Sequence, residues 1–462
     1  MLLSVSRDGP GTLGAQIEDQ LRRAIREGAL RPGTRVPSTR DLARQLGISR
    51  RVAVDAYAQL AAEGYLVLRQ GARPHVSGAA ARPAQHAAAA GPPPRALPPR
   101  YDFRPSTPDV STFPRQAWLR SLRDGLANVT DAELAYGDPR GVEALRTALA
   151  DYLGRVRGAV ADPERIVVTC GYSQGLGLVC RALAQRGARR IAFEDPSFPE
   201  QKLIAARAGL EPVAVPVDER GVRVDELRRA DADLVALTPA HQHPTGVVLA
   251  GDRRNQLLAW LRERDAYAID DDYDAEYRYD RAAVGALQGL DPERIVYAGS
   301  ASKALTPGIR IGWLVLPPAL LEPVRQEKLI ADRQTDVIGQ HTFADFLARG
   351  ELDRHLRRLR SSYRARRDAL VEALAEELPD AAVRGIAAGL HATVELRHDD
   401  DEEAIVAAIR ARRIAIDTMA EHWTGPRTGP PMLLLGYGQV PEASVRPGVR
   451  VIADAVRAVR QA

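Results

Sequence analysis

The 462-residue chain contains little cysteine and no long hydrophobic run, and these absences exclude several classes of protein. Its two cysteines, Cys170 and Cys180, cannot build a disulfide framework, so we expect reduced thiols. The first residues lack the basic and apolar regions of a signal peptide. The longest apolar runs are interrupted by proline and are too short to cross a bilayer. We therefore expect a cytoplasmic protein.

Lysine is the scarcest charged residue. Lys202, Lys303 and Lys328 are the three lysines among 64 basic residues, and the others are arginines. Lys303 lies in the stretch GSASKALTPGIR, behind two serines and ahead of an arginine. Arginine cannot replace lysine where an uncharged amine is needed, because a guanidinium stays protonated. Position 303 is therefore a candidate for chemistry that requires an amine.

Composition divides the chain into three parts. Residues 78–100 hold nine alanines and six prolines, which is typical of a semi-stiff linker. Residues 1–77 carry 12 arginines against seven acidic residues, whereas the whole chain has a net charge of +4. We expect a small basic domain with an anionic partner over residues 1–77, then the linker, then a large domain over residues 101–462.

Residues 1–77 show the pattern of three helices followed by a two-stranded ribbon. Apolar residues recur at helical spacing in residues 13–28, and Ser38 and Ser49 are suitable N-caps for two further helices. The last stretch of this part predicts two short strands around Gly71. Helix, turn, helix and wing in this order are typical of a DNA-binding domain.

Arginines lie where such a domain meets DNA. The recognition helix enters the major groove by its N-terminal end, where arginine reaches guanine edges and phosphates, and a basic wing reaches the adjacent groove. The residues that these positions nominate for DNA contact are Arg40, Ser49, Arg50, Arg51, Arg69 and Arg73. A small helical interaction domain with surface arginines is the alternative interpretation.

The same part of the chain resembles a known family. The PG turn, the stretch VPSTRDLA and the closing EGYL are similar to the GntR-type winged helix, and the similarity covers nearly all of residues 11–76. The resemblance implies a bacterial transcription factor that binds operator DNA as a dimer. We assign Tyr57 and Leu60 to the core of this domain rather than to its DNA surface.

The large domain alternates strand-like and helical stretches, which indicates an α/β fold with a mostly parallel sheet. A long amphipathic helix, a strand and a final helix then predict a smaller α+β subdomain. In YAIDDDYDAEY, a strand places Asp271 and Tyr273 on one face, at the end where such sheets bind ligands. Asp270 and Asp272 point the other way, and one of them is expected to cap the strand end or to meet solvent.

Other groups complete a recognisable inventory. The start of a helix after a glycine turn, and the two serines and the arginine around Lys303, suit a phosphate. A carboxylate, a phenol, a phosphate cradle and an unhindered amine are what pyridoxal phosphate requires, because the amine forms the Schiff base and the carboxylate keeps the ring nitrogen protonated. A surface lysine near an unrelated phosphate site is the alternative. We expect no metal site.

Residues 101 to about 440 resemble the fold-type I aminotransferases, and the linked pair of domains resembles the MocR/GabR-type regulators. YGDPRGVEALRTALADYL, EDPSFP, HQHPTG, IDDDYDAEYRY and GSASKALTPGIRIGW follow in the expected order. The resemblance implies a Schiff-base lysine, partners of the ring and its 3-oxygen, phosphate ligands, a stacking aromatic and a tyrosine that reaches the other subunit of a homodimer. The Schiff-base lysine is Lys303, the partners of the ring and its 3-oxygen are Asp271, Tyr273 and His243, and the stacking aromatic is Phe198. The tyrosine that reaches the other subunit is Tyr136. The phosphate ligands are Ser173, Gln174, Ser300, Ser302 and Arg310.

The chain departs from the aminotransferase pattern at two positions. His243 replaces the asparagine that normally helps to hold the 3-oxygen, and Leu434 stands where related transaminases place the arginine that grips the substrate carboxylate. Without that bidentate anchor, efficient transamination is doubtful. His391, in GLHATVEL, is a candidate for facing the ligand, with a core or surface histidine as the alternative.

These features together predict a transcriptional regulator that senses through bound pyridoxal phosphate. An amine or amino-acid ligand would displace Lys303 and shift a domain equilibrium that the linker transmits to DNA binding. Alternatively, the cofactor itself is the signal and the protein reports vitamin B6 supply. The competing hypothesis is an active aminotransferase with an appended DNA-binding domain.

Overall fold

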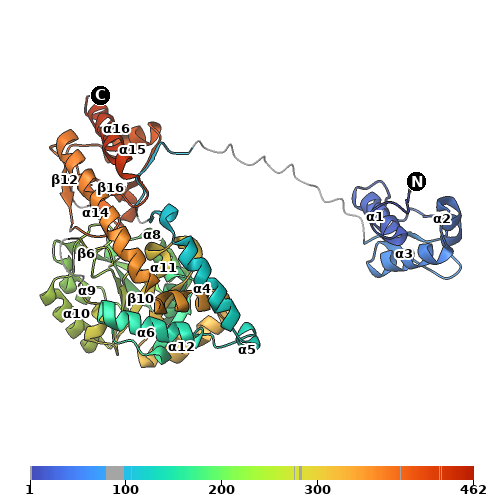
Figure 1. Ribbon diagram of the computed structural model, residues 1–462, viewed down its shortest axis with the longest axis horizontal. Helices are drawn as coiled ribbons and strands as arrows, with labels where there is room; N and C mark the ends of the chain where they lie inside the picture. Colours follow the sequence, from blue (N-terminus) through green and yellow to red (C-terminus); the bar gives the residue numbers. More distant parts are fainter. Residues whose placement is uncertain are drawn as a thin grey trace. The chain divides into compact units, whose positions relative to one another are not determined.

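The computed structural model describes residues 3–79, 98–105, 107–274, 276–279, 284–385, 387–425, 427 and 429–461. The chain forms two compact units, Met1–Leu97 and Pro98–Ala462, which are described separately below (Figure 1). Most of the predicted linker, residues 80–97, lies outside the described residues. Among the helices of the described ranges, none has the length and apolar character needed to cross a membrane.

The first unit is a three-helix domain with a two-stranded wing, as the sequence predicts. Each helix begins at a hydroxyl side chain that accepts a main-chain N–H, and Gly47 ends the second helix in the left-handed conformation. The antiparallel strands pair Leu66 with Val76. The elements are α1 (Leu13–Arg26), α2 (Thr39–Leu46), α3 (Arg50–Ala62), β1 (Leu66–Val67) and β2 (His75–Val76).

The core of this unit lies between the first and third helices. Ile17, Leu21 and Ile25 are buried on one face of α1 and pack with α3. Tyr57 and Leu60 are fully buried, which confirms their assignment to the core, and the Tyr57 hydroxyl donates to the Pro37 carbonyl at 3.0 Å. The arginines therefore remain on the outside of a domain whose interior is apolar.

An eight-stranded sheet organises the second unit, and its strand order is β4-β11-β10-β9-β8-β5-β6-β7. The sheet is parallel except for β11 and β7, which run antiparallel to their neighbours. The strands are β4 (Ile166–Thr169), β5 (Arg190–Asp195), β6 (Glu211–Asp218), β7 (Gly221–Val222), β8 (Leu234–Leu237), β9 (Tyr267–Asp271), β10 (Ile295–Ser300) and β11 (Gly312–Val315). The prediction of a mostly parallel sheet is confirmed.

Both faces of this sheet are buried. In β8, Leu234 and Ala236 belong to one apolar cluster, whereas Val235 and Leu237 belong to another. This alternation follows from the two-residue period of a strand that helices cover on both sides. The neighbouring helices include α4 (Arg115–Asn128), α5 (Asp131–Leu134), α6 (Glu143–Arg157), α7 (Tyr172–Gln185), α8 (Pro199–Arg207), α9 (Val224–Arg229), α10 (Gly251–Arg264), α11 (Ala301–Ala304), α12 (Pro318–Asp332) and α13 (Val337–Ala348) (Figure 1).

A smaller α+β subdomain follows, as predicted. Its sheet has the order β12-β13-β16-β15, and the short strand β3 pairs with β14 beside it. The elements are β3 (Tyr101–Asp102), α14 (Glu351–Glu377), β12 (Ala382–Arg384), β13 (His391–Glu395), α15 (Glu402–Ala411), β14 (Ile414–Ala415), β15 (Asp417–Thr418), β16 (Met432–Gly436) and α16 (Glu442–Arg460).

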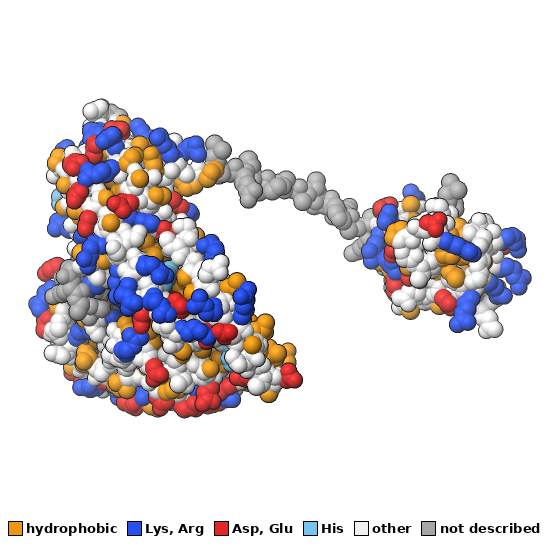
Figure 2. All heavy atoms as spheres, viewed as in Figure 1, with side chains coloured by type: hydrophobic (Ala, Val, Ile, Leu, Met, Phe, Trp, Pro, Cys, Tyr) orange, Lys and Arg blue, Asp and Glu red, His pale blue; other side chains and the backbone are white. Residues whose placement is uncertain are grey.

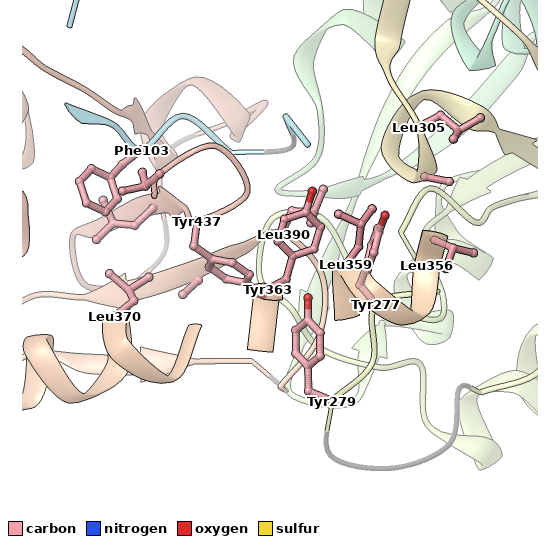
Figure 3. Packing of buried hydrophobic residues seen from close by; sticks show 14 of the residues in the cluster. Phe103, Tyr277, Tyr279, Leu305, Leu356, Leu359, Tyr363, Leu370, Leu390 and Tyr437 are labelled. Carbon is pink, nitrogen blue, oxygen red and sulfur yellow. The ribbon is translucent and has the colours of Figure 1, made fainter. Parts of the chain in front are cut away.

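One apolar core joins the subdomain to the large sheet. Figure 3 shows Phe103 and Leu370 at one end of this core and Tyr277 and Leu305 at the other. Tyr437 lies between them, and its hydroxyl donates to the Gly389 carbonyl at 2.8 Å. A displacement of the subdomain would therefore reach the carboxyl ends of the parallel strands.

Candidate functional site

A cavity of about 250 Å³ lies at the carboxyl ends of the parallel strands, where open α/β sheets bind ligands. Its walls come from the loops that follow β4, β5, β8, β9 and β10. Many of the cofactor-binding residues predicted from the sequence lie together here. The lining residues are Tyr172, Ser173, Phe198, Gln201, Thr238, His243, Asp271, Tyr273, Ser300, Ser302, Lys303, Pro307 and Arg310.

The carboxylate of Asp271 is buried and the Lys303 side chain is half-buried, and both line this cavity. Asp271 is the last residue of β9, and Lys303 lies on the short helix α11 directly after β10. Burial raises the pKa of Asp271 well above its usual value, and the neighbouring Asp272 and Asp270 raise it further. Burial lowers the pKa of Lys303, although Asp274 and Asp271 oppose that effect. A lowered pKa favours the neutral, nucleophilic form of an amine.

Groups that suit a phosphate gather at one end of the cavity. Gly171 precedes α7 with a φ of +98°, so the first N–H groups of that helix lie beside the Arg310 guanidinium, which donates to the Cys170 carbonyl. A Cβ on Gly171 would come within 3.1 Å of that guanidinium. Ser300 and Ser302 line the same cavity. A helix N-terminus, hydroxyls and a guanidinium form an anion site.

Gln174 takes a different position from the other predicted phosphate ligands. Its side-chain oxygen accepts from the Cys170 N–H at 2.7 Å, and its amide nitrogen donates to Asp332 at 2.6 Å. The fully buried Lys328 also donates to Asp332, at 2.7 Å. The Gln174 side chain is therefore bonded to protein groups and stabilises the loop before α7, so only the main-chain N–H of Gln174 is available to a phosphate.

Histidines surround Tyr273, and the sequence patterns did not single out all of them. His241 Nδ1 lies 2.9 Å from Asp274 Oδ2 and 3.1 Å from the Tyr273 hydroxyl, and both His241 and Asp274 are buried. The main chain of Gly389 packs directly on the pair, because a Cβ there would meet His241 Cε1 at 2.3 Å. The stretch HQHPTG contains both His241 and His243, and the comparison with the aminotransferase pattern singles out His243 alone.

The His243 ring lies near four other aromatic rings, and the centroid of the Tyr273 ring is 5.8 Å from it. The His243 centroid is 5.1 Å from that of His391, 5.2 Å from that of His422 and 6.1 Å from that of Phe198. His243 is buried, its Nδ1 has no hydrogen-bond partner in the described chain, and burial lowers its pKa well below the usual value. His391 is also buried and lies behind His243 rather than among the residues that line the cavity.

The two aspartates on the opposite face of β9 and the loop after it correct one expectation. Neither Asp270 nor Asp272 meets solvent. Asp272 accepts from Arg157 Nε at 2.6 Å and from the Tyr297 hydroxyl at 2.7 Å, and Asp270 accepts from the Gln288 N–H at 3.1 Å. A buried carboxylate requires such partners, and the sequence did not reveal Arg157 because it lies 115 positions away.

The residues present fit pyridoxal phosphate. Asp271 is a buried carboxyl that a protonated ring nitrogen would satisfy, and His243, whose buried Nδ1 has no partner in the described chain, lines the same cavity. The phosphate group has the N-terminal end of α7 and Arg310. Phe198 lines the cavity, as a ring-stacking residue must.

Leu434 and Tyr136 lie outside the cavity lining. Leu434 is fully buried in β16, opposite Thr393 and Asp417. Among the described residues that line the cavity, the cationic side chains are Lys303 and Arg310. Tyr136 is 82% exposed, so a role for it at a site in another subunit stays a prediction.

The residues nominated for DNA contact lie on the surface of the first unit, where Figure 2 shows arginine side chains projecting. Ser49 accepts from the Val52 N–H at 3.4 Å and so also caps α3. Arg51 has a long ion pair of 3.8 Å with Asp55. All six of the nominated residues are exposed: Arg40, Ser49, Arg50, Arg51, Arg69 and Arg73.

Two family models match the chain. Residues 13–76 match the bacterial regulatory proteins of the gntR family, and residues 106–423 match aminotransferase class I and II. The chain is 33% identical to the "HTH-type pyridoxine biosynthesis transcriptional regulator PdxR" of Corynebacterium glutamicum, covering 97% of this chain and 96% of the relative. It is 29% identical to the "Probable rhizopine catabolism regulatory protein MocR" of Rhizobium meliloti, with 99% and 96% covered.

Solved aminotransferases share the fold of the second unit. The multiple substrate aminotransferase of Thermococcus profundus superposes with a TM-score of 0.71 at 26% identity, covering 78% of this chain and 92% of that one. The kynurenine aminotransferase of Pyrococcus horikoshii superposes with a TM-score of 0.70 at 25% identity, with 77% and 90% covered.

Proposed function

We propose that this protein controls transcription in response to a small amine. The chain belongs to the MocR-type transcriptional regulators. In these proteins a gntR-family winged helix precedes an aminotransferase class I and II domain that binds pyridoxal phosphate. One observation carries this proposal. A half-buried Lys303 lines a cavity whose lining lacks a carboxylate-anchoring arginine in the described chain, since Leu434 is buried at that position. Such a site suits recognition of an amine better than repeated turnover of amino acids.

The cofactor supplies an aldehyde that bonds to primary amines and a ring that withdraws electrons. Lys303 provides the amine of the protein, and its lowered pKa favours the form that can bond. The Asp271 carboxyl would hold the proton of the ring nitrogen, and the Tyr273 hydroxyl would donate to the ring 3-oxygen. His241 and Asp274 fix the position of that hydroxyl by their contacts of 3.1 and 2.9 Å.

Contacts within the second unit provide a route from the site to the segment that enters this unit at Pro98. Thr393 of β13 donates to the Pro244 carbonyl at 2.6 Å, which ties the small subdomain to the HQHPTG loop. The same subdomain holds β3 through its pairing with β14, and Phe103 lies in its core. An effector that competes with Lys303 would bias the position of this subdomain and thereby pull on the chain that leads to the winged helix.

We further propose that the protein acts as a homodimer. Tyr136 and several apolar side chains are exposed near one another in sequence, on α4 and around α5. Leu126 and Leu134 are 53% and 51% exposed. Large exposed apolar side chains of this kind are typical of an interaction surface, and a second copy would bring its Tyr136 to the phosphate end of the cavity.

The decisive experiment measures the cofactor spectrum and DNA affinity on the same full-length preparation. Wild-type protein with pyridoxal phosphate should be yellow and should bind the DNA upstream of its gene. Lys303→Ala should lose the absorbance, and an activating or inhibiting amine should change the DNA affinity of the wild type but not of this variant. A colourless wild type in excess cofactor would contradict the proposal.

A second candidate signal is the cofactor itself. The relative from Corynebacterium glutamicum carries the name of a pyridoxine biosynthesis regulator, and it aligns over nearly the whole chain. In that case, titration with pyridoxal phosphate alone would change DNA affinity, and amines would add nothing. Robust multiple-turnover transamination of an amino acid with a keto acid would instead favour an active aminotransferase.

A further inference from the structure

Three buried imidazoles lie together at one side of the cavity, and we call His243, His391 and His422 the imidazole wall. His243 lines the cavity itself. The rings of His391 and His422 lie against it, with centroid separations of 5.1 and 5.2 Å. The three residues come from the loop after β8, from β13 and from the segment after β15. Within the described ranges, no group of His, Cys, Asp and Glu side chains is arranged to hold a metal ion.

Hydrogen bonds to main-chain carbonyls fix the proton positions on two of these rings. His391 Nε2 lies 3.3 Å from the Pro244 carbonyl oxygen, and His422 Nδ1 lies 3.2 Å from the Thr418 carbonyl oxygen. A carbonyl accepts but never donates, so each of these nitrogens carries the hydrogen. In a neutral ring, the other nitrogen then presents a lone pair. His391 Nδ1 is buried and has no partner in the described chain.

The rings remain neutral because they are buried. Burial lowers the pKa of His391 to about 3, and the nearby His241 lowers it further while Asp274 opposes the shift. Burial also lowers the pKa of His422, against the effects of its bond to Thr418 and of Asp417 and Glu421. The wall is therefore uncharged near neutral pH, and the His391 and His422 rings each keep one ring nitrogen that can accept a hydrogen bond.

Among the described residues that line the cavity, no arginine lies beside the imidazole wall. Arg310 lies at the other end, against Cys170 and Gly171. Leu434 fills the position at which the sequence pattern expects an arginine. Lys202 is nearby, but its amine donates to the His422 carbonyl at 3.3 Å and lies 3.9 Å from Asp195 Oδ1. Its charge is thus already directed at protein groups.

We propose that the imidazole wall selects amines whose remote group donates hydrogen bonds, such as a hydroxyl or a second amino group, and disfavours amines that end in a carboxylate. This inference rests on the proposed function, because it takes the cavity to be the effector site. A donor satisfies the bare ring nitrogens, whereas carboxylate oxygens would face lone pairs without a compensating cation. The absence of an anchoring arginine then reflects a different effector class.

Three amines with the same carbon skeleton test this selectivity. Propanolamine carries a terminal hydroxyl, propylamine a methyl group and β-alanine a carboxylate. Each is titrated into full-length protein loaded with pyridoxal phosphate, and binding is followed by the cofactor absorbance. We expect propanolamine to bind at least about tenfold more tightly than propylamine, since one satisfied buried polar pair is worth about 1.4 kcal/mol or more. β-Alanine should bind most weakly.

Substitutions then assign the preference to the wall. His391→Leu removes the acceptor and should reduce the ratio between propanolamine and propylamine to about one, whereas His391→Asn keeps an acceptor and should retain part of that ratio. His422→Gln tests the same point from another element. An unchanged ratio in the folded His391→Leu and His422→Gln variants would overturn the proposal.

The outcomes separate this inference from the proposed function. If all three amines bind equally, or if β-alanine binds tightest, the wall does not select donors although the cavity still senses amines. Loss of β-alanine binding in Lys202→Ala would then identify Lys202 as the carboxylate anchor. If no amine alters the absorbance of the bound cofactor, the amine-sensing function itself fails, and the selectivity inference falls with it.

Discussion

The winged helix and the aminotransferase-like domain hold their functional side chains in opposite environments. In the first unit, the six residues nominated for DNA contact are all exposed. In the second unit, Asp271, His243 and the groups behind them are buried, with charged partners such as Arg157 and Asp272 also out of solvent. One domain presents charge to water and to a polyanion, and the other keeps charge inside the protein.

This difference teaches where substitutions should act. An exposed arginine costs the fold little when it is removed, so its loss appears in DNA affinity and salt dependence. A buried charged side chain is stable only when its partner is present. Removing the partner therefore lowers the unfolding free energy of the domain first and weakens cofactor binding second. The predictions below test that separation.

The largest effect should follow from breaking the buried Arg157–Asp272 pair. Asp272→Asn leaves the guanidinium without its carboxylate, and the two side chains are 1% and 2% exposed. We expect a loss of about 3–5 kcal/mol in the unfolding free energy of the second unit, because an unpaired buried charge cannot be solvated. Denaturant unfolding of full-length protein measures the change, and the transition of the first unit serves as the internal control. A loss below about 1 kcal/mol would contradict the comparison.

The next effect concerns DNA. Replacing both Arg50 and Arg51 by alanine should weaken operator binding by about 2–3 kcal/mol and lower the salt dependence of binding by about two phosphate contacts. The cofactor absorbance should not change, because both side chains lie on the other unit. Arg23→Ala removes an exposed arginine of α1 and serves as the matched control, with DNA affinity close to wild type. Equal losses in the variant and the control would indicate a general charge effect rather than a recognition helix.

A smaller effect depends on pH. Burial raises the pKa of Glu194 to about 7, from an ordinary value of 4.5, and its carboxylate accepts from the Thr238 N–H and hydroxyl at 2.9 Å. The native state therefore binds the proton of Glu194 more tightly than the unfolded chain does. Because of this, the contribution of Glu194 to the unfolding free energy falls as the pH rises from about 4.5 to 7 and is constant at higher pH. Glu194→Gln removes the titration. Between pH 5 and 8, the variant should gain about 1–3 kcal/mol relative to wild type. Parallel stability curves would contradict this.

Much of the fold could be predicted from local patterns. The caps at Ser38 and Ser49, the inward face of α1 and the strand around Asp271 depend on near neighbours in sequence, and each is found as predicted. Lys303 and Arg310 belong to one short motif, so their shared location in the cavity also followed from the sequence.

The rest of the site depends on contacts between distant segments. Asp274 lies 33 positions from His241, Thr238 lies 44 positions from Glu194, and His391 reaches a carbonyl 147 positions away. Spacing cannot indicate such pairs. The pairing of β8 with β5 and β9 brings the first two together, and the packing of the small subdomain on the large sheet brings the third. The packing of α12 on α7 likewise places the Gln174 side chain against Asp332 rather than in the cavity.

The smallest effect should follow from removing a buried but uncharged polar group in the first unit. Tyr57→Phe deletes the hydroxyl that donates to the Pro37 carbonyl at 3.0 Å, and nothing charged loses a partner. We expect a loss of about 0.5–1.5 kcal/mol, which lowers the melting temperature of this domain by several degrees. DNA affinity, measured well below that temperature, should stay at the wild-type value, because the ring remains in the core and α3 keeps its position. A loss as large as that of Asp272→Asn would show that burial alone, and not buried charge, separates the two units.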